Sequence, residues 1–156
     1  MSEFEAVYRE YFPLICRYSY SLCRSRALAE DLAQDTFLKA MKHIGSFRGD
    51  CRLEVWLCRI AKNTWYTYQK KHLRGQSLDE LPFEPFTRDE DPDAAMELHR
   101  ALDRLEEPYR EVVSLRALGD LSFAQIAQLH GKTESWTRVT FHRGKLKLKE
   151  MMEEPT

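Results

Sequence analysis

Two stretches of this sequence combine cationic side chains with aromatic or hydrogen-bonding ones, which is the chemistry of nucleic-acid binding. Residues 48–74 contain seven Lys/Arg against two acids, interleaved with four Trp and Tyr side chains. Residues 132–149 contain six Lys/Arg against one acid. Cations neutralise phosphates, and aromatic rings are platforms on which unpaired bases stack. The first stretch therefore suits single strands and the second suits duplex DNA.

Residues 122–151 have the pattern of a helix-turn-helix. Ser122 and Gln125 form a capping box at the start of a short helix that ends at a turn around Gly131. Thr133 then caps a long basic helix that runs to about residue 151. In this motif the second helix enters the major groove.

The first turns of that basic helix would meet base edges. Arg138 can pair with guanine, and Thr140 and His142 can touch bases or phosphates. A basic amphipathic helix can also be no more than a solvated face, so this motif alone does not establish DNA binding. The first cationic stretch is an independent indication of nucleic-acid binding, since its aromatic rings suit unpaired bases. A plain repressor needs only a surface for duplex DNA, whereas a protein that helps to open a promoter needs both surfaces.

An acidic segment separates the two basic stretches. The formal net charge is −1, yet residues 76–93 contain seven Asp/Glu against one Arg. Prolines in the same segment favour an extended linker over a helix. We place the linker at residues 75–92, between domains at residues 1–74 and 93–156.

Helical periodicity without an alternating strand pattern predicts an all-α fold of two small domains. The first is expected to have three or four helices, with Pro13 kinking or interrupting the first of them. The second contains the helix-turn-helix. On the helix expected over residues 26–44, the side chains predicted to face inward are Leu28, Leu32, Phe37, Met41 and Ile44.

The other reactive side chains form no recognisable catalytic or metal centre, and no cofactor is expected. The five histidines are scattered, without an H-E-x-x-H, P-loop or G-x-S-x-G motif. None of the four cysteines forms a C-x-x-C pair, which favours small apolar residues in a reduced core. A disulfide or metal site between two helices is the alternative for Cys16, Cys23, Cys51 and Cys58.

No apolar run approaches the roughly 20 residues of a membrane span. The N-terminal stretch MSEFEAVYRE is acidic and amphipathic, unlike a signal peptide. We therefore expect a cytoplasmic protein without direct membrane insertion.

Several segments, in order, carry a family resemblance. They are AEDLAQDTFLKAMKHIGSFRGD (29–50), WLCRIAKN (56–63), LEEPYREVVSLRALGDLSFAQIAQLHGK (105–132) and the triplet Phe141-His142-Arg143. Over about residues 4–74 and 94–150 the chain resembles the small extracytoplasmic-function (ECF) sigma factors of the sigma-70 family. The resemblance implies a protein that binds core RNA polymerase, recognises the −10 and −35 promoter elements and assists promoter melting.

The resemblance implies three groups of site residues. Those that dock on the clamp helices of the polymerase's largest subunit would be Asp31, Leu32, Gln34, Asp35 and Phe37. Those that hold a flipped −10 base and its phosphates would be His43, Phe47, Arg48, Arg59, Ile60, Lys62, Asn63 and Thr67. Those that read the −35 element would be Arg138, Thr140, His142 and Arg143, with Lys132, Ser135, Lys145 and Lys147 on the DNA backbone.

The resemblance also implies partners. They are core RNA polymerase, through its clamp helices and flap, promoter DNA, and an anti-sigma factor, often membrane-anchored. The acidic linker would follow a basic nucleic-acid path through the polymerase. Trp136, Cys51 and Val55 depart from the family's pattern. Trp136 either packs into the domain or shifts the recognition helix, so the preferred −35 sequence cannot be carried over.

Two other interpretations remain open. A stand-alone helix-turn-helix regulator would be a dimer that binds paired half-sites without polymerase. It would leave the acidic linker and residues 48–74 without a role. A helical adaptor that uses its basic faces for proteins would show no DNA-dependent readout. A sigma factor would bind promoters weakly alone and selectively with polymerase.

Overall fold

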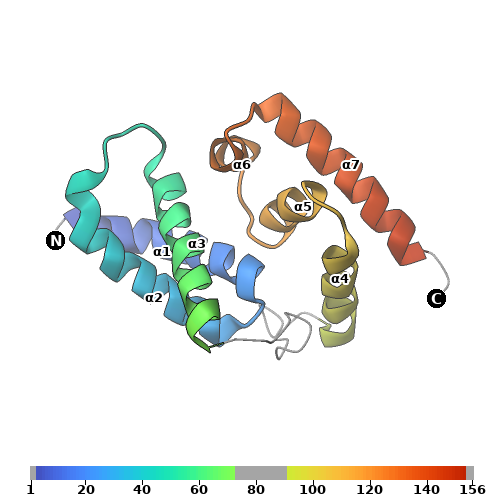
Figure 1. Ribbon diagram of the computed structural model, residues 1–156, viewed down its shortest axis with the longest axis horizontal. Helices are drawn as coiled ribbons and strands as arrows, with labels where there is room; N and C mark the ends of the chain where they lie inside the picture. The colour runs from blue at the N-terminus through green and yellow to red at the C-terminus, as the bar shows by residue number, and fades with distance from the viewer. Residues whose placement is uncertain (1–2, 73–90, 154–156) are drawn as a thin grey trace.

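The computed structural model of the chain describes residues 3–72 and 91–153. Within these ranges the chain forms seven α-helices and one 3₁₀ turn, without a strand (Figure 1). The predicted all-α fold is confirmed. The predicted acidic linker lies outside the described residues, except for its last two positions.

Three long helices build the N-terminal half. They are α1 (Glu3–Cys23), α2 (Arg26–His43) and α3 (Leu53–His72), with the 3₁₀ turn η1 (Ile44–Ser46) after α2. α1 continues through Pro13, so the predicted interruption does not occur. Pro13 is exposed, so water can solvate the carbonyl that lacks its helical partner.

The apolar stripes of these helices meet in one core. Ile15 from α1, Phe37 from α2 and Leu57 from α3 are fully buried in it. Three aromatic rings of α1 lie 5.1 to 6.3 Å, between centroids, from the ring of Phe37. Aromatic burial of this size stabilises the docking of α1 on α2.

The inward orientation predicted for Met41 and Ile44 is wrong. Their side chains are 50 % and 43 % exposed. The buried stripe of α2 passes through Phe37 and Ala40, and Met41 lies one residue beyond it, on the next face. α2 also ends at His43, before Ile44.

Four helices build the C-terminal half. They are α4 (Pro92–Arg104), α5 (Tyr109–Ala117), α6 (Phe123–His130) and α7 (Glu134–Glu153). Leu102, Val113 and Leu148 form a buried cluster between α4, α5 and α7. At Gly144 a Cβ atom would lie 2.7 Å from Val113 Cγ2, so glycine permits close contact between α5 and α7.

The predicted helix-turn-helix is confirmed in its local geometry. The Ser122 hydroxyl accepts a hydrogen bond from the Gln125 N–H, and the Gln125 side chain accepts one from the Ser122 N–H. Gly131 ends α6 with φ of 63°, a conformation that favours glycine. The Thr133 hydroxyl accepts a hydrogen bond from the Trp136 N–H at 3.0 Å and caps α7.

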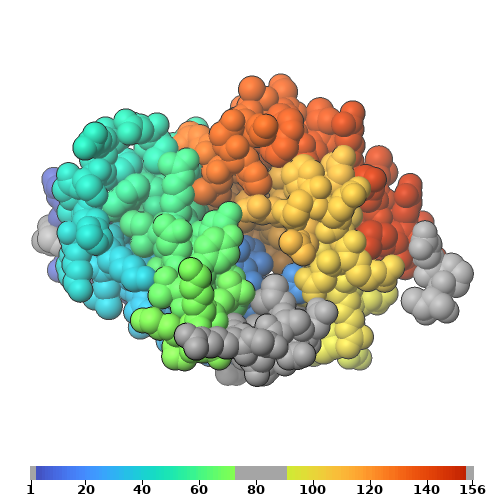
Figure 2. All heavy atoms as spheres, in the orientation of Figure 1, coloured from blue at the N-terminus to red at the C-terminus, as the bar shows by residue number. Residues whose placement is uncertain are grey.

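The two halves pack against each other. One buried cluster contains Ile15 and Leu57 from the N-terminal half and Leu115 and Ile126 from the C-terminal half. Figure 2 shows the α6 region in contact with the N-terminal half near the top of this view, where α6 meets α3. Two domains were expected on a tether, and in this structure their apolar surfaces are continuous.

Candidate polymerase and nucleic-acid interfaces

The exposed face of α2 is acidic and amide-bearing at its centre. Asp31, Gln34 and Asp35 are exposed, with Gln34 and Asp35 one helical turn after Asp31. The same face continues to Leu38 and Met41, which are 54 % and 50 % exposed. Large apolar side chains beside carboxylates suit a protein partner with basic and apolar groups.

The structure differs from the prediction at two of the five core-binding residues. The side chains of Leu32 and Phe37 are each 2 % exposed. They belong to the stripe that packs on the neighbouring helices, so in this structure they hold α2 in place and are not part of its exposed face. Sequence reasoning missed Leu38, although it is four residues after Gln34 and three after Asp35, which places it on their face.

α3 presents an exposed polar stripe. Arg59, Asn63 and Thr67 are exposed and are spaced four residues apart, so they share one face. Ile60 is half-buried beside them. An arginine, an amide, a hydroxyl and an apolar edge can together hold phosphates and a base edge.

The turn after α2 brings more of the residues predicted for the −10 element to the N-terminal end of α3. Phe47 is half-buried, and its ring lies 5.3 Å from the Trp56 ring. Trp56 is one helical turn before Ile60, so Phe47 lies near the stripe of α3. His43 and Arg48 flank this turn and are exposed.

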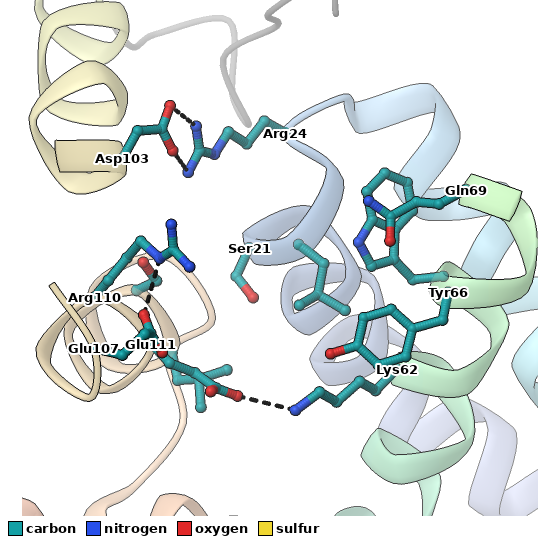
Figure 3. Close-up of a pocket in the computed structure, with 13 residues that line it drawn as sticks. Ser21, Arg24, Lys62, Tyr66, Gln69, Asp103, Glu107, Arg110 and Glu111 are labelled. Atoms are coloured by element: carbon teal, nitrogen blue, oxygen red, sulfur yellow. Dashed lines mark hydrogen bonds and ion pairs between the residues drawn. The ribbon is translucent and has the colours of Figure 1, made fainter. Parts of the chain in front are cut away.

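Two of the cations predicted to hold −10 phosphates contact the C-terminal half. Arg59 donates a hydrogen bond to the Gln128 carbonyl at 3.1 Å. Lys62 Nζ lies 3.3 Å from a Glu111 carboxylate oxygen (Figure 3). Burial alone would lower the pKa of Lys62, but Glu111 and Tyr66 outweigh it and raise the net pKa. The ammonium is therefore held in its charged form by Glu111.

α7 carries the residues predicted for the −35 element. Its exposed face contains most of the side chains predicted to read or hold the −35 element. These are Ser135, Arg138, His142, Arg143, Lys145 and Lys147, with Lys132 exposed in the preceding turn. Lys147 also lies 3.6 Å from Glu106. This face suits the major groove, where cations meet phosphates and arginine meets guanine.

Thr140 differs from its prediction. It is 5 % exposed and lies on the face of α7 that packs on the domain. Thr137, three residues earlier, is buried on the same face. Because the helix has 3.6 residues per turn, Thr140 cannot share the exposed face of Arg138 and His142. The prediction that Thr140 reads the −35 element therefore disagrees with its burial in this structure.

Trp136 packs into the domain. Its half-buried ring contacts the large buried cluster and lies 5.7 Å from the His130 ring. The Lys132 ammonium lies 5.5 Å from the Trp136 ring centroid. Of the two interpretations left open for Trp136, packing into the domain is the observed one.

Phe123, which was not singled out from the sequence, contacts Arg138, one of the residues predicted to read the −35 element. The Arg138 guanidinium lies 4.9 Å from the Phe123 ring centroid. Arg116 lies 4.8 Å from the same centroid and donates a hydrogen bond to the Leu121 carbonyl. Cation–π contacts of this length restrain the guanidinium where α6 meets α7.

The cysteines are free thiols, three of them buried. Burial, with a smaller effect of Glu30, raises the pKa of Cys16 to about 12, and burial also raises the pKa of Cys58. Among the residues the structure describes, no group of three His, Cys, Asp or Glu side chains is placed to hold a metal ion. No helix of residues 3–72 or 91–153 is long and apolar enough to cross a membrane.

Comparison with known proteins decides the family. Residues 7–75 match the family described as Sigma-70 region 2, and residues 95–148 match Sigma-70, region 4. The RNA polymerase sigma factor YlaC of Bacillus subtilis is 31 % identical, with 95 % of this chain and 91 % of that protein covered. The sigma factor CarQ of Myxococcus xanthus is 31 % identical, with 97 % and 90 % covered.

The chain belongs to the extracytoplasmic-function sigma factors of the sigma-70 family. It is an RNA polymerase sigma factor, with region 2 in α1–α3 and region 4 in α4–α7. The fold agrees with a solved structure of the sigma factor RpoE in complex with the anti-sigma factor NepR from Bartonella quintana. That chain is 23 % identical, with a TM-score of 0.72 and full coverage of both chains. CnrH in complex with the cytosolic domain of CnrY has a TM-score of 0.66 at 21 % identity, with 98 % of this chain and 89 % of that one covered.

Proposed function

We propose that this sigma factor uses three separate surfaces to start transcription. The α2 face with Asp31, Gln34, Asp35 and Leu38 docks on the clamp helices of core RNA polymerase. The α3 face and the Phe47 turn bind the −10 element as unpaired bases, and the exposed face of α7 reads the −35 element. The residues assigned to the −10 element are His43, Phe47, Arg48, Arg59, Ile60, Lys62, Asn63 and Thr67.

The observation that carries this proposal is the exposed stripe of α3 beside the Phe47 turn. Asn63 and Thr67 are exposed on one face of α3, and Phe47 supplies an aromatic ring near the start of this helix. A regulator that binds only duplex DNA does not need such a surface. A protein that stabilises melted DNA needs one, because it must hold a base that has left the base stack of the duplex.

We assign residues 1–74 and 93–156 to the two functional domains, with residues 75–92 as the linker that follows the nucleic-acid path of the polymerase. The polymerase flap is the proposed partner of region 4. An anti-sigma factor, soluble or membrane-anchored, is the proposed regulator, since the sigma factor RpoE is seen in complex with the anti-sigma factor NepR. The chain would act in the cytoplasm, with no catalytic chemistry of its own.

A stand-alone helix-turn-helix regulator is the competing function. It predicts a dimer with polymerase-independent affinity for paired half-sites. Size-exclusion chromatography with light scattering gives the oligomeric state of the purified chain, and fluorescence anisotropy with a labelled promoter duplex gives its affinity for DNA. A monomer that binds duplex weakly supports the sigma-factor mechanism, and a dimer with tight, sequence-specific binding contradicts it.

A holoenzyme assembly assay tests the docking surface. Asp35→Arg places a cation where we expect basic groups of the polymerase, so the affinity for core should fall about tenfold or more. Glu10→Arg is the matched control, since Glu10 is also exposed but lies on α1, outside the proposed surfaces. Equal affinities for both variants would contradict the assignment of α2.

A fork-junction template tests the −10 surface. With saturating core, Asn63→Ala should weaken binding to a template with an unpaired −10 element and leave a fully duplex −35 fragment unaffected. Arg138→Ala should show the opposite dependence. The same loss on both templates for either variant would contradict the division of labour between α3 and α7.

A further inference from the structure

An apolar side chain lies on the outward face of α7, in the second turn of this helix. Val139 is 47 % exposed. Leu148 follows about two and a half turns later and belongs to a buried cluster with Leu102 and Val113. Residues separated by a half-integral number of turns lie on opposite sides of a helix, so Val139 points away from the domain. Val139 is absent from the residues predicted to read the −35 element.

The exposed side chains next to Val139 are polar or cationic. Ser135 lies four residues before it, and His142 and Arg143 lie three and four residues after it. Residues at these spacings are neighbours on one helix face. Arg138, the residue before Val139, is exposed as well. The apolar side chain therefore lies within a face whose cations suit phosphates.

A valine in this position matches one feature of the major groove. The first turns of the second helix of a helix-turn-helix meet base edges. Most groups on those edges donate or accept hydrogen bonds, and the apolar exception is the C5-methyl group of thymine. The valine side chain forms no hydrogen bond, and its branching at Cβ leaves it one strongly preferred rotamer in a helix. It therefore presents a fixed apolar surface to that methyl group.

A protein partner is the other class of ligand for an exposed apolar face. Leu146 is 63 % exposed and lies about 10 Å further along α7, on the same face as Val139. His142 and Arg143 lie between the two, and a lysine stands on either side of Leu146. Charged residues are depleted at the core of protein interfaces, so a stripe interrupted and flanked by cations favours DNA over a protein.

We propose that Val139 determines specificity at one position of the −35 element, where it contacts the C5-methyl group of a thymine. The inference rests on the proposed reading of this element by α7. Arginine and histidine read hydrogen-bonding groups, and Val139 adds a preference for T·A over C·G, which has no methyl group at this place. One methyl group removed from water corresponds to about a two- to fivefold change in affinity.

Selection by the complete holoenzyme from promoters with a randomised −35 element gives the first readout. The wild type should select a thymine at one position, in addition to the bases that the arginines read. Val139→Ser should lose the preference at that position alone. Val139→Thr keeps one of the two methyl groups and should retain the preference. Valine, serine and threonine have similar helix propensities, so neither substitution should unfold α7.

Uracil gives the second readout, because it differs from thymine only in lacking the methyl group. On the selected promoter, uracil in place of that thymine should weaken binding of the wild-type holoenzyme about two- to fivefold. Val139→Ser should bind both promoters equally. Leu146→Ser is the matched control, since it removes an exposed apolar side chain from the same face about two turns away, and it should respond to uracil as the wild type does.

Three results would overturn the role of Val139. They are a wild type that tolerates uracil, a Val139→Ser variant as sensitive to uracil as the wild type, and a selected −35 sequence that Val139→Ser leaves unchanged. Weaker assembly with core polymerase in both Val139→Ser and Leu146→Ser, without dependence on the base, would assign this face to a protein partner instead. Failure of the proposed function is a distinct result, since the wild-type holoenzyme would then select no −35 sequence at all.

Discussion

Lowering the pH should destabilise the packing of α4 through His99. This side chain is 4 % exposed, with its ring perpendicular to that of Tyr20 at 5.9 Å between centroids. Burial, and next the positive charge of Arg24, lower the pKa of His99 from 6.5 to about 4, while Asp103 acts in the opposite direction. The folded state therefore keeps His99 neutral at a pH at which the unfolded chain protonates it.

The two pKa values fix the size of the effect. Because the pKa is lower in the folded state, the contribution of His99 is complete above pH 6.5 and is lost as the pH falls toward 4. At about pH 5 the unfolded state binds the proton and the folded state largely does not. Unfolding is then favoured about 30-fold more than at neutral pH, which equals about 2 kcal/mol.

Urea unfolding at about pH 7.5 and pH 5 measures this difference. His99→Gln removes the titrating group, so the wild type should lose about 2 kcal/mol more than the variant between the two pH values. The comparison is between changes with pH, so a constant cost of the substitution cancels. An equal loss in both proteins, within about 0.5 kcal/mol, would refute the role of His99.

Three further substitutions test other parts of the structure. Gly144→Val should lower the free energy of unfolding by about 1–3 kcal/mol, because the valine side chain would collide with α5. Thermal melting measures this loss. Gly45→Ala is the control, since nothing lies within 4 Å of a Cβ atom at Gly45. Phe123→Leu should weaken binding of the holoenzyme to a −35 duplex two- to fivefold, about 0.5–1 kcal/mol, and should add nothing to Arg138→Ala; additive losses would contradict the contact between these side chains. Leu38→Arg should weaken holoenzyme assembly about tenfold or more, and unchanged assembly would remove Leu38 from the docking surface.

Local signals predicted the helices well. The Ser122 capping box, the turn at Gly131 and the Thr133 cap all lie where the sequence placed them, because each depends on side chains within a few residues. Asp91 caps α4 with Pro92 at its first position, another start that depends on neighbouring residues alone. Of the two effects expected of Pro13, the interruption does not occur, and the residue is exposed, so water can reach the carbonyl that it leaves without a helical partner.

Faces were harder to predict than helices. The residues that resemble the family's docking motif include both exposed Asp35 and buried Phe37, because a family motif records packing and contact together. Thr140 was misplaced for a similar reason. A threonine can contact DNA through its hydroxyl, and it can equally pack against the rest of the domain, as it does here. The helical periodicity of α2 does distinguish the two leucines of this stretch, since it places Leu38 on the exposed face and Leu32 on the buried one.

Contacts between the two halves could not be predicted from the sequence. Arg24 and Asp103 are 79 positions apart, and Lys62 and Glu111 are 49 apart. No local pattern links such residues, because their pairing depends on how α1 and α3 are placed against α4 and α5. The sequence marked Lys62 as a phosphate ligand, and the structure adds that the C-terminal half holds it in the free chain.

Mapping the 5′ ends of transcripts tests the promoter-specific action of this sigma factor most directly. The purified chain would be combined with bacterial core polymerase on fragmented genomic DNA of the source organism. Discrete starts that share a two-part upstream motif, absent with core alone and lost with Asp35→Arg, are the expected result. Stable binding to core with starts that share no motif would contradict sequence-specific reading by α3 and α7, and neither binding nor starts would contradict the proposed mechanism as a whole.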